Sequence, residues 1–130
     1  MKRKQIIDVF TDLNKLKTKC IWYSGVEGEG EYKEWYPTGQ LFIHCFYENG
    51  QKSGEYKEWY NAGKLNIHCF YKKDLMQGEY KEWYSNDKLF VHCSFDKGDE
   101  NGEYKSWYKN GKLWTHCIYK KGIEIKDYLK

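Results

Sequence analysis

The sequence predicts an all-β protein: a single-layer antiparallel meander of repeated β-hairpins, capped by a short N-terminal α-helix. Three observations support this fold class. A 24-residue repeat fills most of the 130 residues, strand-like segments alternate with turn motifs inside each repeat, and a helical hydrophobic pattern ends where the repeat begins. A fixed period of this kind is typical of repeat architectures.

The segment before the repeat, residues 1–19, has the periodicity of an amphipathic helix. Its apolar side chains cover about half of a helical wheel. They are Ile6, Ile7, Val9, Phe10, Leu13 and Leu16. We expect this helix to cover the first strands, because the terminal unit of a solenoid needs a cap. The alternative is a basic helix lying on an anionic membrane, which Asp8 and Asp12 on the polar face disfavour.

The repeat array covers residues 20–130. The segment "GEYKEWY" begins at Gly30, returns at Gly54 and Gly78, and becomes "GEYKSWY" at Gly102. "CIWY" before the first copy and "KDY" after the last are partial copies of the repeat. The predicted half-repeat, four repeats and remnant are residues 20–29, 30–53, 54–77, 78–101, 102–125 and 126–130.

Each repeat is predicted to form one β-hairpin. "GEYKEWY" and "QLFIHCFY" are rich in aromatic and branched residues, which suit a pleated, half-buried surface. Between them, "PTG", "NAG", "SND" and "KNG" have the form of a type I turn followed by a residue with positive φ. Two strands and two short turns use all the residues of a repeat, which leaves no room for a crossover helix. An antiparallel meander about ten strands wide follows.

The turn also predicts which side chains share a face. If Tyr36 lies opposite Gln40, alternation collects an apolar set on one face and a mixed aromatic and polar set on the other. In the first repeat the apolar set is Trp35, Leu41, Ile43, Cys45 and Tyr47, and the other set is Tyr32, Glu34, Tyr36, Phe42, His44 and Phe46. The apolar strip is longer than a soluble monomer usually exposes. We therefore expect a two-fold homodimer that packs these strips together or joins terminal edges.

A His-Cys pair recurs in all four repeats, and we interpret it as architecture. Neighbours on a strand point to opposite faces, and equivalent residues of successive repeats lie about 9.5 Å apart. Zinc ligands lie within about 2.3 Å of the ion, and a disulfide needs Cα atoms within about 7 Å. We therefore predict no metal site, no cofactor and five free thiols. Cys45, Cys69, Cys93 and Cys117 are expected to pack as small hydrophobes, with Cys20 on the opposite face. The histidines are expected to hydrogen-bond to tyrosines such as Tyr32 and Tyr56.

A stripe of tyrosines and histidines is the candidate partner-binding site. Its members are Tyr32, His44, Tyr56, His68, Tyr80, His92, Tyr104 and His116. Catalysis is not expected, because no constellation of residues supports it. The first 20 residues carry six basic and two acidic side chains, and the rest of the chain is close to neutral. A nucleic-acid partner is therefore not expected, and the lack of a secretory signal predicts a cytoplasmic location.

The pattern Gly-x-Tyr-x-x-Trp-Tyr-x-x-Gly-x-Leu over residues 20–130 resembles MORN repeats. It is most similar to the variant of bacterial antitoxin-like proteins, and its "HCFY" form resembles repeat proteins of giant DNA viruses and their virophages, which would place it in a host cytoplasm. The resemblance implies a non-enzymatic hairpin array that serves as a scaffold, is often dimeric and is linked to membrane lipids. The usual MORN repeat has Gly two places after the Tyr, where this chain has Glu34, Glu58, Glu82 and Ser106. The lipid association is therefore not carried over to this chain.

Two functions are compatible with the sequence. The first is a scaffold that mediates protein–protein interaction, or its own association, through aromatic sheet faces. The second is a membrane-surface adaptor that uses the basic segment 1–19. Membrane attachment is the weaker expectation, because Asp8 and Asp12 lie on the polar face of the predicted helix.

Overall fold

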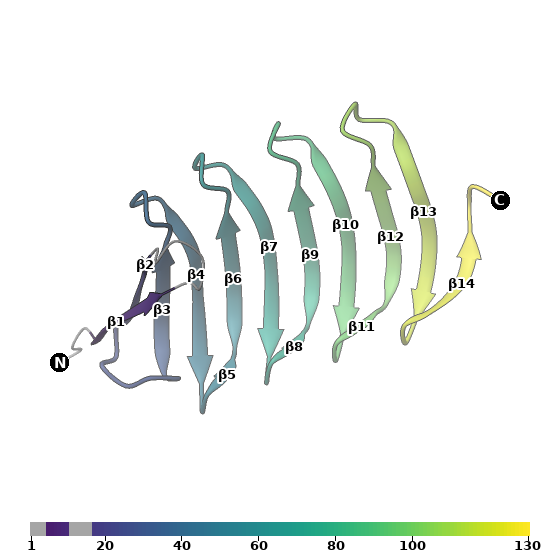
Figure 1. The fold of residues 1–130 in the computed structure, drawn as a ribbon. Helices are drawn as coiled ribbons and strands as arrows, with labels where there is room; N and C mark the ends of the chain where they lie inside the picture. The colour runs from purple at the N-terminus through teal and green to yellow at the C-terminus, as the bar shows by residue number, and fades with distance from the viewer. Residues whose placement is uncertain (1–4, 11–16) are drawn as a thin grey trace.

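The computed structural model describes residues 5–10 and 17–130, which form strands and turns. The long strands lie in one antiparallel sheet in the order β1-β2-β3-β4-β6-β7-β9-β10-β12-β13-β14, and the short strands β5, β8 and β11 pair with β4, β7 and β10. Figure 1 shows this meander as a single layer. The strands are β1 (Gln5–Phe10), β2 (Lys17–Trp22), β3 (Gly30–Trp35), β4 (Leu41–Glu48), β5 (Gln51–Lys52), β6 (Gly54–Trp59), β7 (Leu65–Lys72), β8 (Leu75–Met76), β9 (Gly78–Trp83), β10 (Leu89–Asp96), β11 (Asp99–Glu100), β12 (Gly102–Trp107), β13 (Leu113–Lys120) and β14 (Ile123–Asp127).

Every full repeat is a hairpin closed by the predicted turn. In the first repeat, the Tyr36 amide donates to the Gln40 carbonyl and the Gly39 amide donates to the Tyr36 carbonyl, both at 2.9 Å. Gly39 has a φ of 93°, in the left-handed region where a side chain is strained. Positive φ recurs at the equivalent positions of the other repeats, Gly63, Asp87 and Gly111. The all-β fold and the turn geometry are thus as predicted.

A β-bulge next to this turn changes the predicted faces. Trp35 lies opposite Leu41 as expected, but its neighbour Glu34 lies opposite Ile43, so Phe42 is an extra residue in β4. Two residues on one strand then oppose one on the other, and the alternation of faces is reversed beyond this point. The same register shift occurs between Glu58 and Trp59, and in the third and fourth hairpins.

The corrected assignment gives each repeat two distinct faces. Residues that lie directly opposite each other on neighbouring strands share a face. What we call the cysteine face carries, in the first repeat, Tyr32, Glu34, Ile43, Cys45 and Tyr47. What we call the histidine face carries Glu31, Lys33, Trp35, Leu41, His44 and Phe46. The predicted apolar strip is therefore divided, with its Trp and Leu members on one face and its Ile, Val and Cys members on the other.

The cysteine face holds the core of the sheet. Cys45, Cys69 and Cys117 are 1% exposed and Cys93 is 3% exposed, as expected for small buried hydrophobes. Partly buried tyrosines surround them, and the central cluster is built on Cys45, Tyr56 and Cys69. Cys20 is also buried on this face, opposite Glu34, and not on the other face as predicted.

The helix predicted for residues 1–19 is wrong where this segment is described. Residues 5–10 form β1 and residues 17–19 open β2, which pairs with both β1 and β3. β1 is rich in branched residues that favour strands, and so short an apolar run fits strand and helix periodicity equally. The rest of the prediction, residues 1–4 and 11–16, lies outside the described residues.

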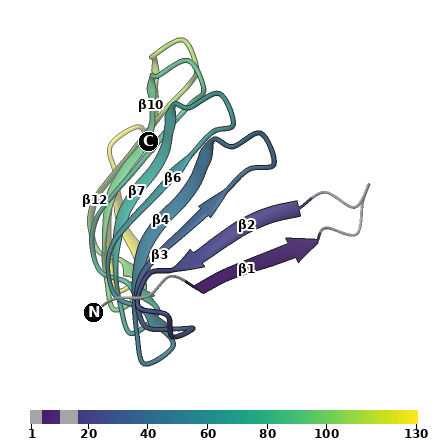
Figure 2. The same ribbon diagram turned by 90° about the vertical axis from the view of Figure 1, so that its left-hand side faces the viewer.

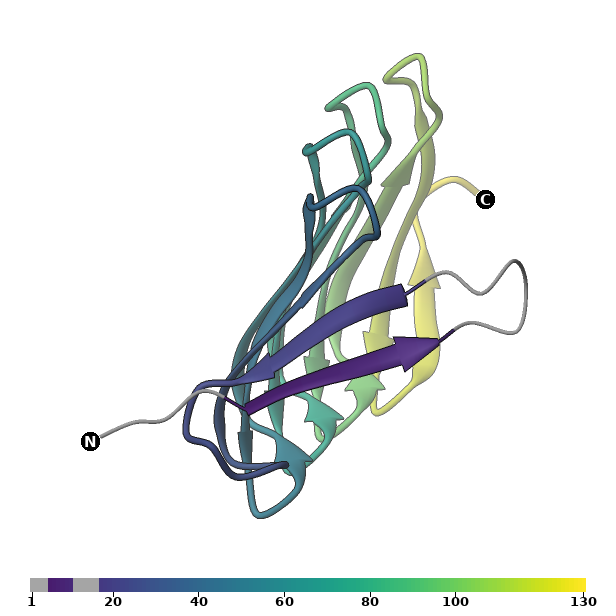
Figure 3. The same cartoon turned by 60° about the vertical axis from the view of Figure 1, so that its left-hand side comes forward.

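The β1–β2 hairpin takes the terminal position expected of the helix. Figure 2 shows it leaving the plane of the curved sheet, and Figure 3 shows it crossing in front of the following strands. The Trp22 ring at the end of β2 lies 4.3 Å from the Tyr32 ring and 4.7 Å from the Tyr47 ring, between centroids. Trp22 is buried by these contacts, so the cysteine face is covered at this end of the sheet.

Candidate interaction surface

The histidine face is organised in rows that run across the strands. Its central row alternates lysine and histidine because the register of the eight long strands between β3 and β13 is matched. In order, the row is Lys33, His44, Lys57, His68, Lys81, His92, Lys105 and His116. Neighbouring strands lie about 4.8 Å apart, so the row presents a basic or titratable group at every strand.

Each histidine in this row is paired with a glutamate thirteen residues earlier. The Nε2 atom of His44 lies 2.8 Å from Oε2 of Glu31, and His68 and His116 have the same distance to Glu55 and Glu103. The fourth pair, His92 with Glu79, is longer at 3.3 Å. Since a carboxylate only accepts, the ring N–H is the donor. The histidines therefore bond to glutamates of their own hairpin and not to tyrosines as predicted.

The glutamates form the second row of this face. His92 and then Lys81 hold the pKa of Glu79 below its ordinary value, and His116 does the same for Glu103. Lysine ammonium groups lie 3.5 to 3.9 Å from three of these carboxylates. These ion pairs are exposed and hold the side chains only weakly, so both signs of charge remain available to a partner.

The third row consists of half-exposed apolar side chains. Trp35 and Leu41 lie opposite each other, and the pair recurs in each repeat as Trp59 with Leu65, Trp83 with Leu89, and Trp107 with Leu113. The rows together give a surface with an apolar band, a basic band and an acidic band. A surface of this kind can bind another molecule by burial and charge complementarity.

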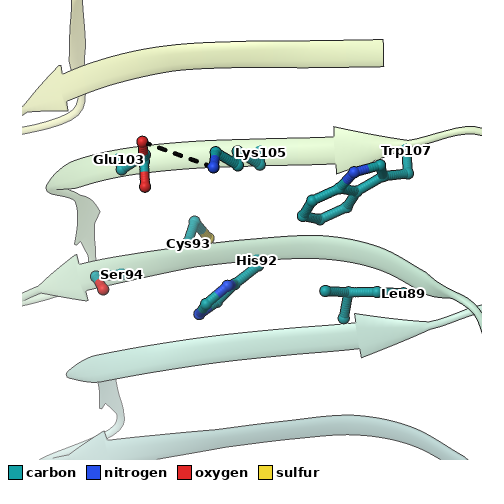
Figure 4. Close-up of a pocket in the computed structure, with 7 residues that line it drawn as sticks. All are labelled: Leu89, His92, Cys93, Ser94, Glu103, Lys105 and Trp107. Atoms are coloured by element: carbon teal, nitrogen blue, oxygen red, sulfur yellow. Dashed lines mark ion pairs between the residues drawn. The ribbon is translucent and has the colours of Figure 1, made fainter. Parts of the chain in front are cut away.

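A hollow interrupts this surface between β10 and β12. It has a volume of about 450 Å³ and is lined by Leu89, His92, Cys93, Ser94, Glu103, Lys105 and Trp107. Figure 4 shows the Trp107 ring and Leu89 at one end and Ser94 with Glu103 at the other. His92 lies between them, and its side chain is 41% exposed, against 27%, 29% and 20% for His44, His68 and His116.

The predicted tyrosine–histidine stripe is two separate sets. Its tyrosines lie opposite the cysteines, as Tyr32 does opposite Cys45, whereas its histidines lie opposite lysines. Tyr32, Tyr56 and Tyr80 donate their hydroxyls to Glu34, Glu58 and Glu82 on the cysteine face, at 2.7 to 2.8 Å. Burial raises the pKa of these tyrosines, and the acceptor glutamate raises it further. The tyrosines are thus part of the core, and the four histidines remain on the candidate surface.

The cysteines are placed for packing. Burial raises the pKa of Cys45, Cys69 and Cys93 to about 12, so these thiols are protonated at neutral pH. All five cysteines are thiols, and none of them is joined in a disulfide. Within residues 5–10 and 17–130, no three His, Cys, Asp or Glu side chains are grouped so that they could hold a metal ion.

Sequence reasoning missed the glutamate and lysine members of the surface. The residues missed are Glu31, Glu55, Glu79, Glu103, Lys33, Lys57, Lys81 and Lys105. The recurring Glu-to-His interval of thirteen residues was the available signal, but it indicates a contact only once the bulge sets the register.

In the part of the chain that the structure describes, no helix is long and apolar enough to span a bilayer.

Comparison with known proteins agrees with the geometry of the array. The MORN repeat variant family matches four consecutive segments, which are residues 28–49, 52–73, 76–97 and 100–121. A search of curated proteins found no match. The matched segments cover more than half of the chain and coincide with the four hairpins, so this chain belongs to the MORN repeat variant family.

Proposed function

We propose that the chain is a non-enzymatic scaffold that binds a protein partner across its histidine face. MORN repeats commonly mediate protein or membrane interactions, which supports a binding role in general. The observation that carries the proposal is the matched register of eight strands, which aligns lysines and histidines in one continuous row. A row of this kind fits a partner that presents acidic side chains, since opposite charges steer association and fix orientation.

Charge reversal at the centre of this row tests the proposal. The variant Lys57→Glu/Lys81→Glu changes two central members of the row. The matched control, Lys88→Glu/Lys112→Glu, makes the same change in net charge at exposed turn positions. Tagged wild type and both variants are used to capture proteins from the native host cell, and the captured proteins are quantified.

Partners of the histidine face are expected to be captured by wild type and by the control, and lost from the central variant. Equal capture by all three proteins would show that the face is not the binding surface. Circular dichroism and the denaturation midpoint check that each variant is folded, so that a loss of capture can be assigned to the surface.

We propose in addition that the chain associates with itself through the edge at β14. Among residues 20–130, whose side-chain exposure is described, ten large hydrophobic residues are exposed, and seven of them lie between residues 108 and 129. The seven are Tyr108, Leu113, Trp114, Ile123, Ile125, Tyr128 and Leu129. β14 is also the last strand of the sheet, so its outer edge offers backbone groups to another strand. A two-fold dimer through this edge would cover both features.

Light scattering over a range of micromolar concentrations tests self-association. We expect a mass above 15.8 kDa that rises with concentration. Ile125→Lys at the edge is expected to restore the monomer mass, while Val26→Lys, an exposed apolar position far from this edge, leaves association unchanged. A monomer mass at every concentration would contradict self-association.

The membrane-adaptor alternative relied on a helix over residues 1–19, and the described part of that segment is strand.

A further inference from the structure

We propose that the hollow between β10 and β12 is a pocket for a single aromatic side chain of the protein partner, and this proposal rests on the scaffold function above. The repeat itself indicates the occupant. The position of Ser94 is held by Phe46 in the first repeat and by Phe70 in the second. Each of these phenylalanines lies opposite a glutamate of its hairpin, as Ser94 lies opposite Glu79.

The two phenylalanines show how a ring is held at this position. The Phe46 ring lies 5.4 Å from the His44 ring and the Phe70 ring lies 5.3 Å from the His68 ring, between centroids. Aromatic pairs at this separation attract each other beyond the effect of burial alone. In the third repeat Ser94 supplies no ring, and His92 is the most exposed of the four histidines.

The remaining walls of the hollow suit a ring from outside the chain. Leu89 and Trp107 provide apolar contact at one end, and Glu103 lies at the other end beside Ser94 (Figure 4). A phenyl or phenol ring would occupy the volume that Phe70 fills in the second repeat. A phenol hydroxyl could also donate to the Glu103 carboxylate or to the Ser94 oxygen. The pocket is therefore matched to the side chain of tyrosine or phenylalanine.

Two substitutions within the repeat test this assignment with a small probe. The probe is para-cresol, which has the structure of the tyrosine side chain, and the readout is the indole N–H signal of each tryptophan in ¹H–¹⁵N NMR spectra. Ser94→Phe fills the hollow with the residue that the first two repeats carry. Phe70→Ser opens an equivalent hollow between β7 and β9, which Trp83 lines as Trp107 lines the natural one.

In the wild-type protein, para-cresol is expected to shift the Trp107 signal in a saturable way, with a dissociation constant on the order of 1 mM. Ser94→Phe is expected to abolish this shift, and Phe70→Ser is expected to add a second saturable shift at Trp83. A Trp107 shift that persists in Ser94→Phe, or no saturable shift in wild type, would overturn the pocket. The spectra themselves report whether each variant is folded.

The pocket and the scaffold function can fail separately. If partner capture is lost in Lys57→Glu/Lys81→Glu but is unchanged in Ser94→Phe, the histidine face binds partners and the pocket is not their anchor. If para-cresol binds as expected and capture is lost in Ser94→Phe, the pocket anchors the partner. If para-cresol binds but charge reversal leaves capture unchanged, the scaffold proposal for this face is wrong.

Discussion

At the scale of single residues, the tyrosine–glutamate pairs determine which substitutions on the cysteine face are costly. The buried Tyr56 hydroxyl donates to Glu58 at 2.8 Å, and Asn66 donates to the other carboxylate oxygen at 3.2 Å. Glu58→Ala would leave the tyrosine hydroxyl buried without its acceptor. We expect a loss of about 1–3 kcal/mol in the free energy of unfolding, measured by urea denaturation.

Two comparisons test the cause of this loss. Glu58→Gln keeps an acceptor near the Tyr56 hydroxyl and is expected to cost less than the alanine variant. Glu48→Ala changes an exposed glutamate at the end of β4 and is expected to stay within about 0.5 kcal/mol of wild type. Equal midpoints for Glu58→Ala and Glu48→Ala would show that the hydrogen bond to Tyr56 contributes nothing.

The buried cysteines predict a protein whose thiols react slowly while it is folded. The thiolate is the reactive form, and burial raises the pKa of Cys45, Cys69 and Cys93 to about 12. We expect native protein at pH 8 to react with a thiol reagent such as DTNB over hours. In guanidinium chloride all five cysteines should react within minutes. Rapid modification of the native protein would contradict the burial of the thiols on the cysteine face.

At the scale of elements, the two-residue turns that follow the second strand of each hairpin differ in how well their residues suit the turn geometry. Asn49 and Gly50 have φ values of 52° and 76°, the left-handed geometry that favours Asn-Gly in such hairpin turns. Lys97 adopts the same conformation with a φ of 51° although lysine is strained there. Lys97→Asn is therefore expected to raise the free energy of unfolding by about 0.5 to 1 kcal/mol.

This gain comes from the backbone and not from a lost contact. The Lys97 amide donates to Gln77 at 2.8 Å, and this bond does not depend on the side chain at residue 97. The reverse change, Asn49→Lys, should destabilise by a similar amount in the same urea titration. If the two substitutions shifted the midpoint in the same direction, side-chain contacts and not φ would govern these turns.

Most of the fold was predictable because it is local and repeated. The turn that closes each hairpin is specified by residues such as Gly39, whose positive φ the sequence indicates directly. The bulge at Phe42 was not predictable, because phenylalanine is also typical of regular strand positions. One extra residue exchanges the faces, and so the Trp35 and Leu41 pair was placed on the wrong side.

The prediction of a helix over residues 1–19 failed for a different reason. A six-residue strand such as β1 is too short for strand and helix periodicities to be separated. The preference of its branched residues and the open edge of β2 decide in favour of a strand, and the second of these is tertiary. Of the candidate surface, only the histidines were predictable from the sequence. The strand register, which the bulge sets, decides which glutamates and lysines lie beside them.

At the scale of the whole molecule, the buried cysteines and tyrosines of the cysteine face predict a loss of stability in alkaline solution. An unfolded cysteine releases its proton near pH 8.5, whereas burial raises the pKa of Cys69 to about 12 in the folded protein. The folded state therefore holds protons that the unfolded state has lost, and stability falls as pH rises. The contribution of the buried thiol to the free energy of unfolding is complete below about pH 8 and declines towards pH 12. Tyr47 and Tyr71, with pKa values also raised by burial to about 12, extend the decline above pH 10.

Thermal melts between pH 7 and pH 11 measure this dependence. The expected result is a melting temperature that is constant near neutrality and falls steadily above about pH 9. The variant Cys45→Ala/Cys69→Ala/Cys93→Ala is less stable at pH 7 but should show a shallower decline between pH 8.5 and pH 10. Parallel curves for the two proteins would exclude the cysteines as the source.

The placement of the terminal strands at opposite ends of one layer also has a mechanical consequence (Figure 1). A force that pulls β1 and β14 apart acts across the strands, so it opens the hydrogen bonds of one strand pair at a time. The sheet should therefore peel from its ends at low force, one hairpin after another. Each 24-residue hairpin would release about 80 Å of chain, so stretching should show evenly spaced steps rather than a single rupture.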